Sequence, residues 1–124
     1  MNSFAKRNNK VLTIYGIPNC DSCRKARKWL DANSVEHRFH DLRVDGIDKE
    51  MLNHWIKSAD WQKLLNTRSA TWRGLTEADK QDLDETRAID LMLLHPTLVK
   101  RPLADSGESV LIGFSEADYA SFKA

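Results

Sequence analysis

The chain has 124 residues and a formal net charge of +1, with 41% hydrophobic and 30% charged residues. Its length fits one domain with a buried core, and its composition is that of a folded protein rather than a disordered one. The balanced charge gives no sign of a nucleic-acid partner, and no apolar stretch is long enough to cross a membrane. No apolar region follows the basic residues Lys6 and Arg7 as it would in a secretory signal, so we expect a cytoplasmic protein.

The first third of the chain predicts a strand, a helix and a second strand. Residues 1–10 are polar and are expected to form a loose lead-in. Residues 11–15 are β-branched and aromatic, which favours a strand. A helix is predicted over residues 21–33, because Asn33 is tolerated in the left-handed position that often ends a helix. Alternating apolar residues predict a short strand over residues 35–42, which completes a βαβ unit.

The remainder of the chain is first helical and then strand-like. Asp48, Asp60 and Thr76 each precede a short apolar-periodic segment and are candidate helix caps, and a further helix is predicted over residues 85–94.

Residues 100–112 predict a β-hairpin in which Gly107 supplies a positive φ, and Ser115 can cap a last helix whose Tyr119 and Phe122 pack inward. The order of elements predicts an α/β fold with a four-stranded mixed sheet, built from the βαβ unit, the hairpin and a C-terminal helix. A helical subdomain is inserted in the middle.

Both cysteines lie in one short stretch between the first predicted strand and the first predicted helix. Cys20 and Cys23 are separated by two residues, and a C-x-x-C at such a turn indicates a redox dithiol. Cys20 is expected just before the first helical turn, where backbone N–H groups and the helix dipole favour a thiolate. Cys23 is expected to be less exposed and to resolve a mixed disulfide. Further positive charge near Cys20 is expected from Arg24, Lys25, Arg27 and Lys28.

Three other interpretations of the cysteines compete with the redox dithiol. They could be small buried hydrophobic residues. They could form half of a zinc site with His37 and His40, although side chains three residues apart on a strand point to opposite faces. They could form a structural disulfide, which a reducing compartment disfavours. We therefore expect no metal site.

Several further segments carry a resemblance to a known family. They are Tyr15–Cys20 (YGIPNC), Arg38–Asp41 (RFHD), Arg43–Gly46 (RVDG), Leu64–Arg68 (LLNTR), Thr71–Arg73 (TWR), Lys100–Leu103 (KRPL) and Leu111–Ser115 (LIGFS). On these segments the sequence resembles the arsenate reductase ArsC/Spx family of the thioredoxin-fold superfamily, most closely its YffB-like branch, from about Lys10 to Phe122. The resemblance implies a single domain over residues 1–124 with a thioredoxin-like core formed by residues 10–47 and 97–124. Residues 48–96 would be the helical insertion.

The resemblance also implies the roles of individual residues. Cys20 matches the nucleophile, Arg101 matches the arginine of an Arg-Pro pair beside the active site, and Pro102 matches the proline that such folds hold in the cis form facing the cysteine. Arg68 lies where the family places another active-site arginine. We expect Cys20, Cys23 and Arg101 to be catalytic, and Arg68, Asn19 and Pro102 to bind substrate. The arginines could stabilise the thiolate and bind an oxyanion or the carboxylates of glutathione through forked hydrogen bonds.

The function that the resemblance implies is a thiol–disulfide oxidoreductase with no bound cofactor, glutathione as co-substrate, and glutathione or a glutaredoxin-like protein as partner. One alternative is arsenate reductase proper, but the family uses a third arginine where this chain has Gly113. The other alternative is an Spx-like redox-sensing regulator that binds the RNA polymerase α subunit, because Spx proteins carry a C-x-x-C whereas typical arsenate reductases lack a cysteine equivalent to Cys23. No nucleic acid or membrane is expected as a direct partner.

Overall fold

The computed structural model describes residues 11–123, so the expected lead-in over residues 1–10 lies outside the described residues. The chain divides into two compact units. The first consists of the described parts of Met1–Asp41 and Arg101–Ala124, and the second is Leu42–Lys100. Within residues 11–123 no helix is both long and apolar enough to span a membrane.

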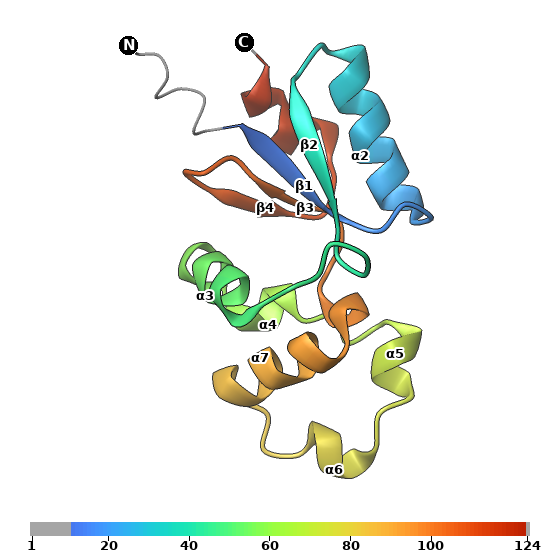
Figure 1. Cartoon of the computed structure of the whole chain (residues 1–124), viewed down its shortest axis with the longest axis vertical. Coiled ribbons are helices and arrows are strands. Elements are labelled where there is room, and N and C mark those ends of the chain that lie inside the picture. Colours follow the sequence, from blue (N-terminus) through green and yellow to red (C-terminus); the bar gives the residue numbers. More distant parts are fainter. Residues whose placement is uncertain (1–10, 124) are drawn as a thin grey trace. The chain divides into compact units, whose positions relative to one another are not determined.

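The first unit is built on a four-stranded mixed sheet (Figure 1). Its strands are β1 (Leu12–Gly16), β2 (His37–Asp41), β3 (Leu103–Asp105) and β4 (Val110–Ile112), in the spatial order β2-β1-β3-β4. β1 pairs parallel with β2 and antiparallel with β3, and β3 pairs antiparallel with β4. The predicted βαβ unit, hairpin and four-stranded mixed sheet are confirmed.

The boundaries of the first two strands differ from the prediction. β1 begins one residue later than expected and includes Gly16, which pairs with Asp41. β2 is shorter than the predicted strand over residues 35–42, because its ladder with β1 extends only from His37 to Asp41.

Helix α2 (Asp21–Ala32) ends one residue before the predicted boundary. The left-handed residue is Ser34, with φ 56°, rather than Asn33, with φ −102°. The N–H of Val35 donates to the carbonyl of Leu30 at 2.9 Å, and the N–H of Ser34 donates to that of Asp31 at 3.1 Å. These two bonds are the pair that a Schellman ending makes, and they satisfy carbonyls that the helix leaves open.

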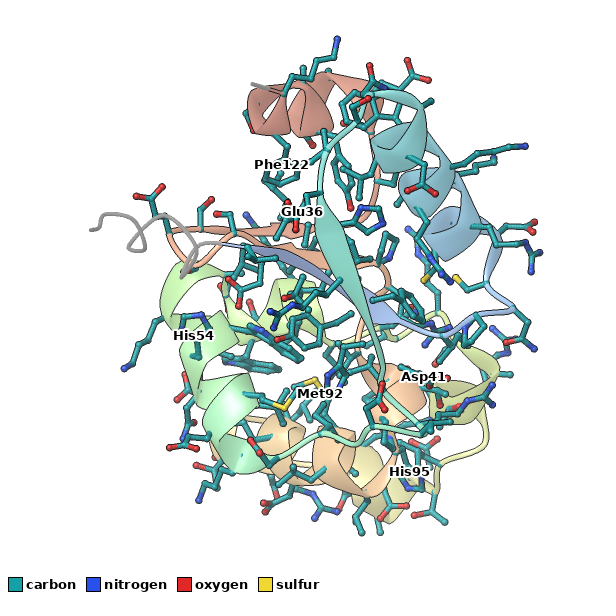
Figure 2. All side chains as sticks on the ribbon, turned by 45° about the horizontal axis from the view of Figure 1, so that its top comes forward. Glu36, Asp41, His54, Met92, His95 and Phe122 are labelled. Carbon is teal, nitrogen blue, oxygen red and sulfur yellow. The ribbon has the colours of Figure 1, made fainter. Side chains whose placement is uncertain are left out.

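One face of the sheet carries the core of the first unit. Leu12 and Ile14 of β1 pack with Ala26 and Leu30 of α2 and with Tyr119. Tyr119 ends α8 (Glu116–Tyr119), which continues as the 3-10 helix η2 (Ala120–Phe122). Phe122, labelled in Figure 2, packs against the same cluster. Full burial of each such leucine or isoleucine contributes about 1.5–3 kcal/mol, so this cluster fixes α2 on the sheet.

The second unit is helical, as predicted. It contains α3 (Lys49–Ser58), α4 (Trp61–Leu64), α5 (Ala70–Arg73), α6 (Glu77–Lys80), α7 (Glu85–Leu94) and η1 (Pro96–Leu98). The side chains of Asp48, Asp60 and Thr76 cap α3, α4 and α6 as expected, and Thr76 forms a complete capping box with Asp79. Met92, labelled in Figure 2, is fully buried, as are Leu52 and Leu64.

Candidate active site

Cys20 is the N-cap residue of α2. Its backbone is extended, at φ −115° and ψ 125°, and its carbonyl accepts the N–H of Arg24 at 2.9 Å. The Cys20 side chain is half-buried at this position. An N-cap position concentrates unpaired N–H groups and the positive end of the helix dipole on this sulfur.

The pKa of Cys20 is lower than that of an ordinary cysteine. Partial burial raises this pKa, but the backbone N–H and the thiol of Cys23 donate hydrogen bonds to the sulfur, and Arg101 adds a further hydrogen bond and a positive charge, which together lower it. The depression expected from the sequence is confirmed in direction. Of the cations expected to act on Cys20, Arg101 does so, as the resemblance implies, whereas the basic residues of α2 do not contribute.

Cys23 lies one turn into α2 and has no solvent-exposed surface. Burial, together with the hydrogen bond to Cys20 and the negative charge there, raises the pKa of Cys23 to about 11, against the opposing effects of the Ile17 N–H and Arg101. Cys23 therefore remains a neutral thiol at physiological pH and donates its proton toward the Cys20 thiolate. The expectation that it is less exposed is confirmed.

Gly16 and Cys23 are in direct contact behind the reactive sulfur. A Cβ at position 16 would overlap Cys23 Sγ, and it would lie 3.5 Å from Cys23 Cβ and 3.6 Å from Cε1 of Phe39. Gly16 was not among the site residues expected from the sequence, although it lies in the Tyr15–Cys20 segment that carries the resemblance. A glycine placed between the first strand and the C-x-x-C was the one available signal, since glycine permits close approach of the backbone.

The peptide bond between Arg101 and Pro102 is cis, as the resemblance implies. Pro102 is buried, and its carbonyl accepts the N–H of Gly113 at 2.8 Å, which ties the start of the hairpin to its end. Gly113 has a φ of 86°, a conformation that side-chain-bearing residues rarely adopt. Position 113, where the resemblance to arsenate reductases implies a third arginine, therefore has a backbone conformation that favours glycine.

The remaining predicted site residues lie in two different units. Asn19 is exposed in the β1–α2 connection, next to Cys20 in the chain. Arg68 is exposed in the second unit; its N–H donates to Oδ1 of Asn66 at 3.0 Å, and its carbonyl accepts from Nη1 of Arg73 at 2.6 Å. The structure thus brings Cys20, Cys23 and Arg101 together, while the substrate-binding roles of Arg68, Asn19 and Pro102 stay predictions.

The two histidines considered as zinc ligands have separate surroundings. Nδ1 of His37 lies 2.9 Å from the carbonyl oxygen of Val35, and its Nε2 is 3.9 Å from a carboxylate oxygen of Asp31. The His40 ring instead packs on Tyr15, with 4.8 Å between ring centroids. Among residues 11–123 no three histidine, cysteine or acidic side chains cluster in a way that could hold a metal ion.

The chain is similar to several known proteins. It is 45% identical over 109 residues to an uncharacterised protein of Haemophilus influenzae, covering 88% of this chain and 96% of that protein. It is 28% identical over 114 residues to the global transcriptional regulator Spx of Streptococcus pyogenes, covering 90% of this chain and 84% of Spx.

Solved structures of similar proteins share the fold. A YFFB protein matches with 45% identity and a TM-score of 0.88, covering 92% of this chain and all of that one. An arsenate reductase (ArsC) related protein from Brucella melitensis matches with 39% identity and a TM-score of 0.72, covering 90% of this chain and 92% of that one. The model of the ArsC family matches residues 15–122, which include the C-x-x-C, the Arg-Pro pair and the helical unit. The chain belongs to the ArsC family and has its thioredoxin-like fold.

Proposed function

We propose that this protein is a thiol–disulfide oxidoreductase in which Cys20 is the nucleophile and glutathione is the reducing co-substrate. The observation that carries the proposal is the opposite shift of two neighbouring thiols, with the pKa of Cys20 lowered and that of Cys23 raised to about 11. Only a thiolate attacks a disulfide, and an unperturbed thiol is only about 3% ionised at pH 7. Hydrogen bonds from Cys23 and Arg101 supply the stabilisation that makes Cys20 competent.

In the first step the Cys20 thiolate attacks one sulfur of a substrate disulfide. The substrate S–S bond breaks, a new S–S bond forms to Cys20, and the second substrate sulfur leaves as a thiolate that takes a proton from solvent. Arg101 is positioned to assist, because its guanidinium hydrogen-bonds the attacking sulfur. Its positive charge can also stabilise the negative charge that develops on the leaving sulfur.

In the second step glutathione, rather than Cys23, releases the bound half of the substrate. Cys23 has no exposed surface to pass its proton to water, and no described carboxylate or imidazole influences its ionisation. A glutathione thiolate therefore attacks the mixed disulfide and regenerates the Cys20 thiolate. A second glutathione then reduces the mixed disulfide of glutathione and substrate, giving oxidised glutathione. Arg101 and Arg68 are the candidate ligands for the carboxylates of glutathione, since a guanidinium binds a carboxylate through two parallel hydrogen bonds.

The test is a glutathione-dependent assay that follows reduction of hydroxyethyl disulfide. We expect Cys20→Ser to abolish turnover and Cys23→Ser to retain it. Turnover that is unchanged in Cys20→Ser would overturn the proposal. If Cys23→Ser lost turnover while Cys20 titrated normally, release of the bound half of the substrate would have to be assigned to Cys23 instead of glutathione.

Two alternatives have specific support. Arsenate reduction is supported by the similarity to the Brucella melitensis protein, but Gly113 stands where the family's third arginine would bind the oxyanion. An Spx-like regulatory role is supported by the similarity to Spx and by the C-x-x-C. It predicts that the protein binds the RNA polymerase α subunit and that binding differs with and without dithiothreitol. Binding that is absent or indifferent to dithiothreitol would count against it.

A further inference from the structure

The outward face of α2 carries a basic stripe that the chemistry at Cys20 does not use. Cys23, Ala26 and Leu30 are its buried residues. On the opposite side of the helix Lys25 and Lys28 are exposed and nearly in line, as residues three apart on a helix are. Neither lysine contributes to the lowered pKa of Cys20, where the acting cation is Arg101. The thiol chemistry at Cys20 therefore does not account for the positive charge of Lys25 and Lys28.

The other charged groups of α2 already have neighbours. Arg24 pairs with Asp21, and the Arg27 guanidinium lies over the Phe39 ring at 4.1 Å from its centroid. In contrast, Lys25 and Lys28 form no ion pair with any residue between positions 11 and 123. The two ammonium groups are therefore available to an acidic partner from outside the molecule.

Apolar side chains lie beside the two lysines on the surface of the first unit. Lys25 and Lys28 line a shallow hollow together with Trp29, Ala32, Phe114 and Glu116, between α2 and the segment that follows β4. The two lysines also line a second, more polar hollow on α2, whose other charged residues are Arg24, Arg27, Asp21 and Asp31, so its net charge is positive. Aromatic side chains such as those of Trp29 and Phe114 are enriched at protein interfaces.

We propose that this surface, formed by Lys25, Lys28, Trp29, Ala32 and Phe114 and termed the α2 face, docks an acidic polypeptide segment whose disulfide is delivered to Cys20. The proposal rests on the proposed reductase function and names the substrate class of the same site. Ala32, at the far end of this face, is twelve residues beyond Cys20, about 18 Å along α2 at 1.5 Å per residue, whereas an extended tripeptide such as glutathione spans only about 10 Å. A protein segment fits this length, and the co-substrate alone does not require it.

The reaction on such a partner balances with the co-substrate already named. The Cys20 thiolate attacks one sulfur of the partner's disulfide, and the other sulfur leaves as a thiolate and is protonated. Glutathione then breaks the mixed disulfide, so that one disulfide and two glutathione molecules give two thiols and one oxidised glutathione. Docking along α2 places the partner's disulfide at the end of the helix where Cys20 lies.

A matched pair of probes tests the α2 face. Each is the disulfide-linked dimer of a cysteine peptide of about ten residues, long enough to follow α2. One peptide is rich in glutamate, and the other has glutamine at the same positions. We expect wild-type kcat/KM to be about tenfold higher for the glutamate peptide at low ionic strength and the preference to disappear at high salt. The double variant Lys25→Glu/Lys28→Glu should lose the preference while reducing neutral hydroxyethyl disulfide normally.

The control variant is Lys57→Glu/Lys63→Glu, which reverses two exposed lysines of the helical unit and should keep the preference. Equal turnover of the two peptides by wild type would overturn the proposal. Equal loss of all three substrates in Lys25→Glu/Lys28→Glu would also overturn it, because the lysines would then act on the thiol chemistry. If wild type reduced no disulfide at all, the reductase function itself would fail, which is a distinguishable result.

Discussion

Gly16 and Cys23 are packed so closely that the first atom of any side chain at position 16 would overlap the Cys23 sulfur. The Cys23 side chain is fully buried, so it has no free space in which to move away from Gly16. The contact therefore fixes the thiol that donates a hydrogen bond to Cys20. This contact links the end of β1 directly to the first turn of α2.

Replacing Gly16 by alanine should destabilise the protein and disturb the site. Overpacking of a filled interior costs about 1–3 kcal/mol, so we expect Gly16→Ala to lower the free energy of unfolding by this amount. The pKa of Cys20 should rise at the same time, because the Cys23 donor is displaced. Urea unfolding and a thiolate titration by ultraviolet absorbance measure the two effects.

Two variants control this prediction. A Cβ at Gly74 would make only ordinary contacts, 3.5 Å from the nearest atom, so Gly74→Ala should leave stability nearly unchanged. Removing the Cys23 sulfur makes space, so Gly16→Ala should cost less in a Cys23→Ala background than alone. An equal cost in both backgrounds would show that the Gly16–Cys23 contact is not the cause.

Arg101 should control the ionisation of Cys20. Its hydrogen bond and charge both lower the pKa of Cys20, so Arg101→Leu should raise that pKa, and a shift of one unit would reduce the thiolate fraction by up to about tenfold at a pH below the pKa. The pH at which kcat/KM reaches half its maximum should move up by the same amount. Lys25→Met, which removes a charge from the outer face of α2, should leave the titration in place. A larger shift in Lys25→Met than in Arg101→Leu would contradict the assignment.

Cys23 should act as a hydrogen-bond donor more than as a resolving thiol. Serine retains an O–H donor whereas alanine has none, so the pKa of Cys20 should rise more in Cys23→Ala than in Cys23→Ser. Both variants should still turn over when glutathione is present, because the second step does not need Cys23. Accumulation of a stable mixed disulfide on Cys20 in both variants, despite excess glutathione, would contradict this role.

The hydroxyl of Tyr119 lies in the core without a hydrogen-bond partner among the described residues. Burial, with the nearby charges of Cys23 and Asp118, raises the pKa of this phenol. An unsatisfied buried hydroxyl costs about 1–3 kcal/mol, so Tyr119→Phe should keep or increase the free energy of unfolding at neutral pH. The same change at half-buried Tyr15, measured by urea unfolding, provides the comparison. A loss of more than about 1 kcal/mol in Tyr119→Phe would reveal a hydrogen bond formed in solution.

The raised pKa of Cys23 should make stability fall in alkali. The folded state holds the neutral thiol up to about pH 11, while the unfolded chain ionises at about 8.5. The stabilisation is therefore complete below about pH 8.5 and is lost as the pH rises toward 11. The free energies of unfolding of Cys20→Ser and of Cys20→Ser/Cys23→Ala, measured between pH 7 and 10, separate the contribution of the Cys23 thiol from that of Cys20. The double variant should lose less stability over that range, and parallel curves would contradict the shift.

The elements that the sequence predicts most closely are those with local signals at both ends. Helix α7 has the predicted bounds, because Asp84 caps its first turn and Pro96 lies two residues after its last residue, Leu94. The end of α2 is less well predicted, because Ser34 rather than Asn33 adopts the left-handed conformation. β2 is shorter than predicted because its length is set by pairing with β1, which a single-strand pattern does not contain.

The sequence by itself determined that the two cysteines lie at a strand-to-helix turn and that Cys20 precedes the helix, because both follow from short-range propensity and spacing. Only the tertiary structure decided which cation acts on Cys20. The sequence offered both the basic residues of α2 and, through the family resemblance, Arg101 and Arg68, and the fold brings Arg101 to the sulfur. Likewise, the full burial of Cys23 and its close packing against Gly16 exist only in the assembled fold. Burial and electrostatic interaction depend on distances in space, so they are set when the sheet and α2 assemble.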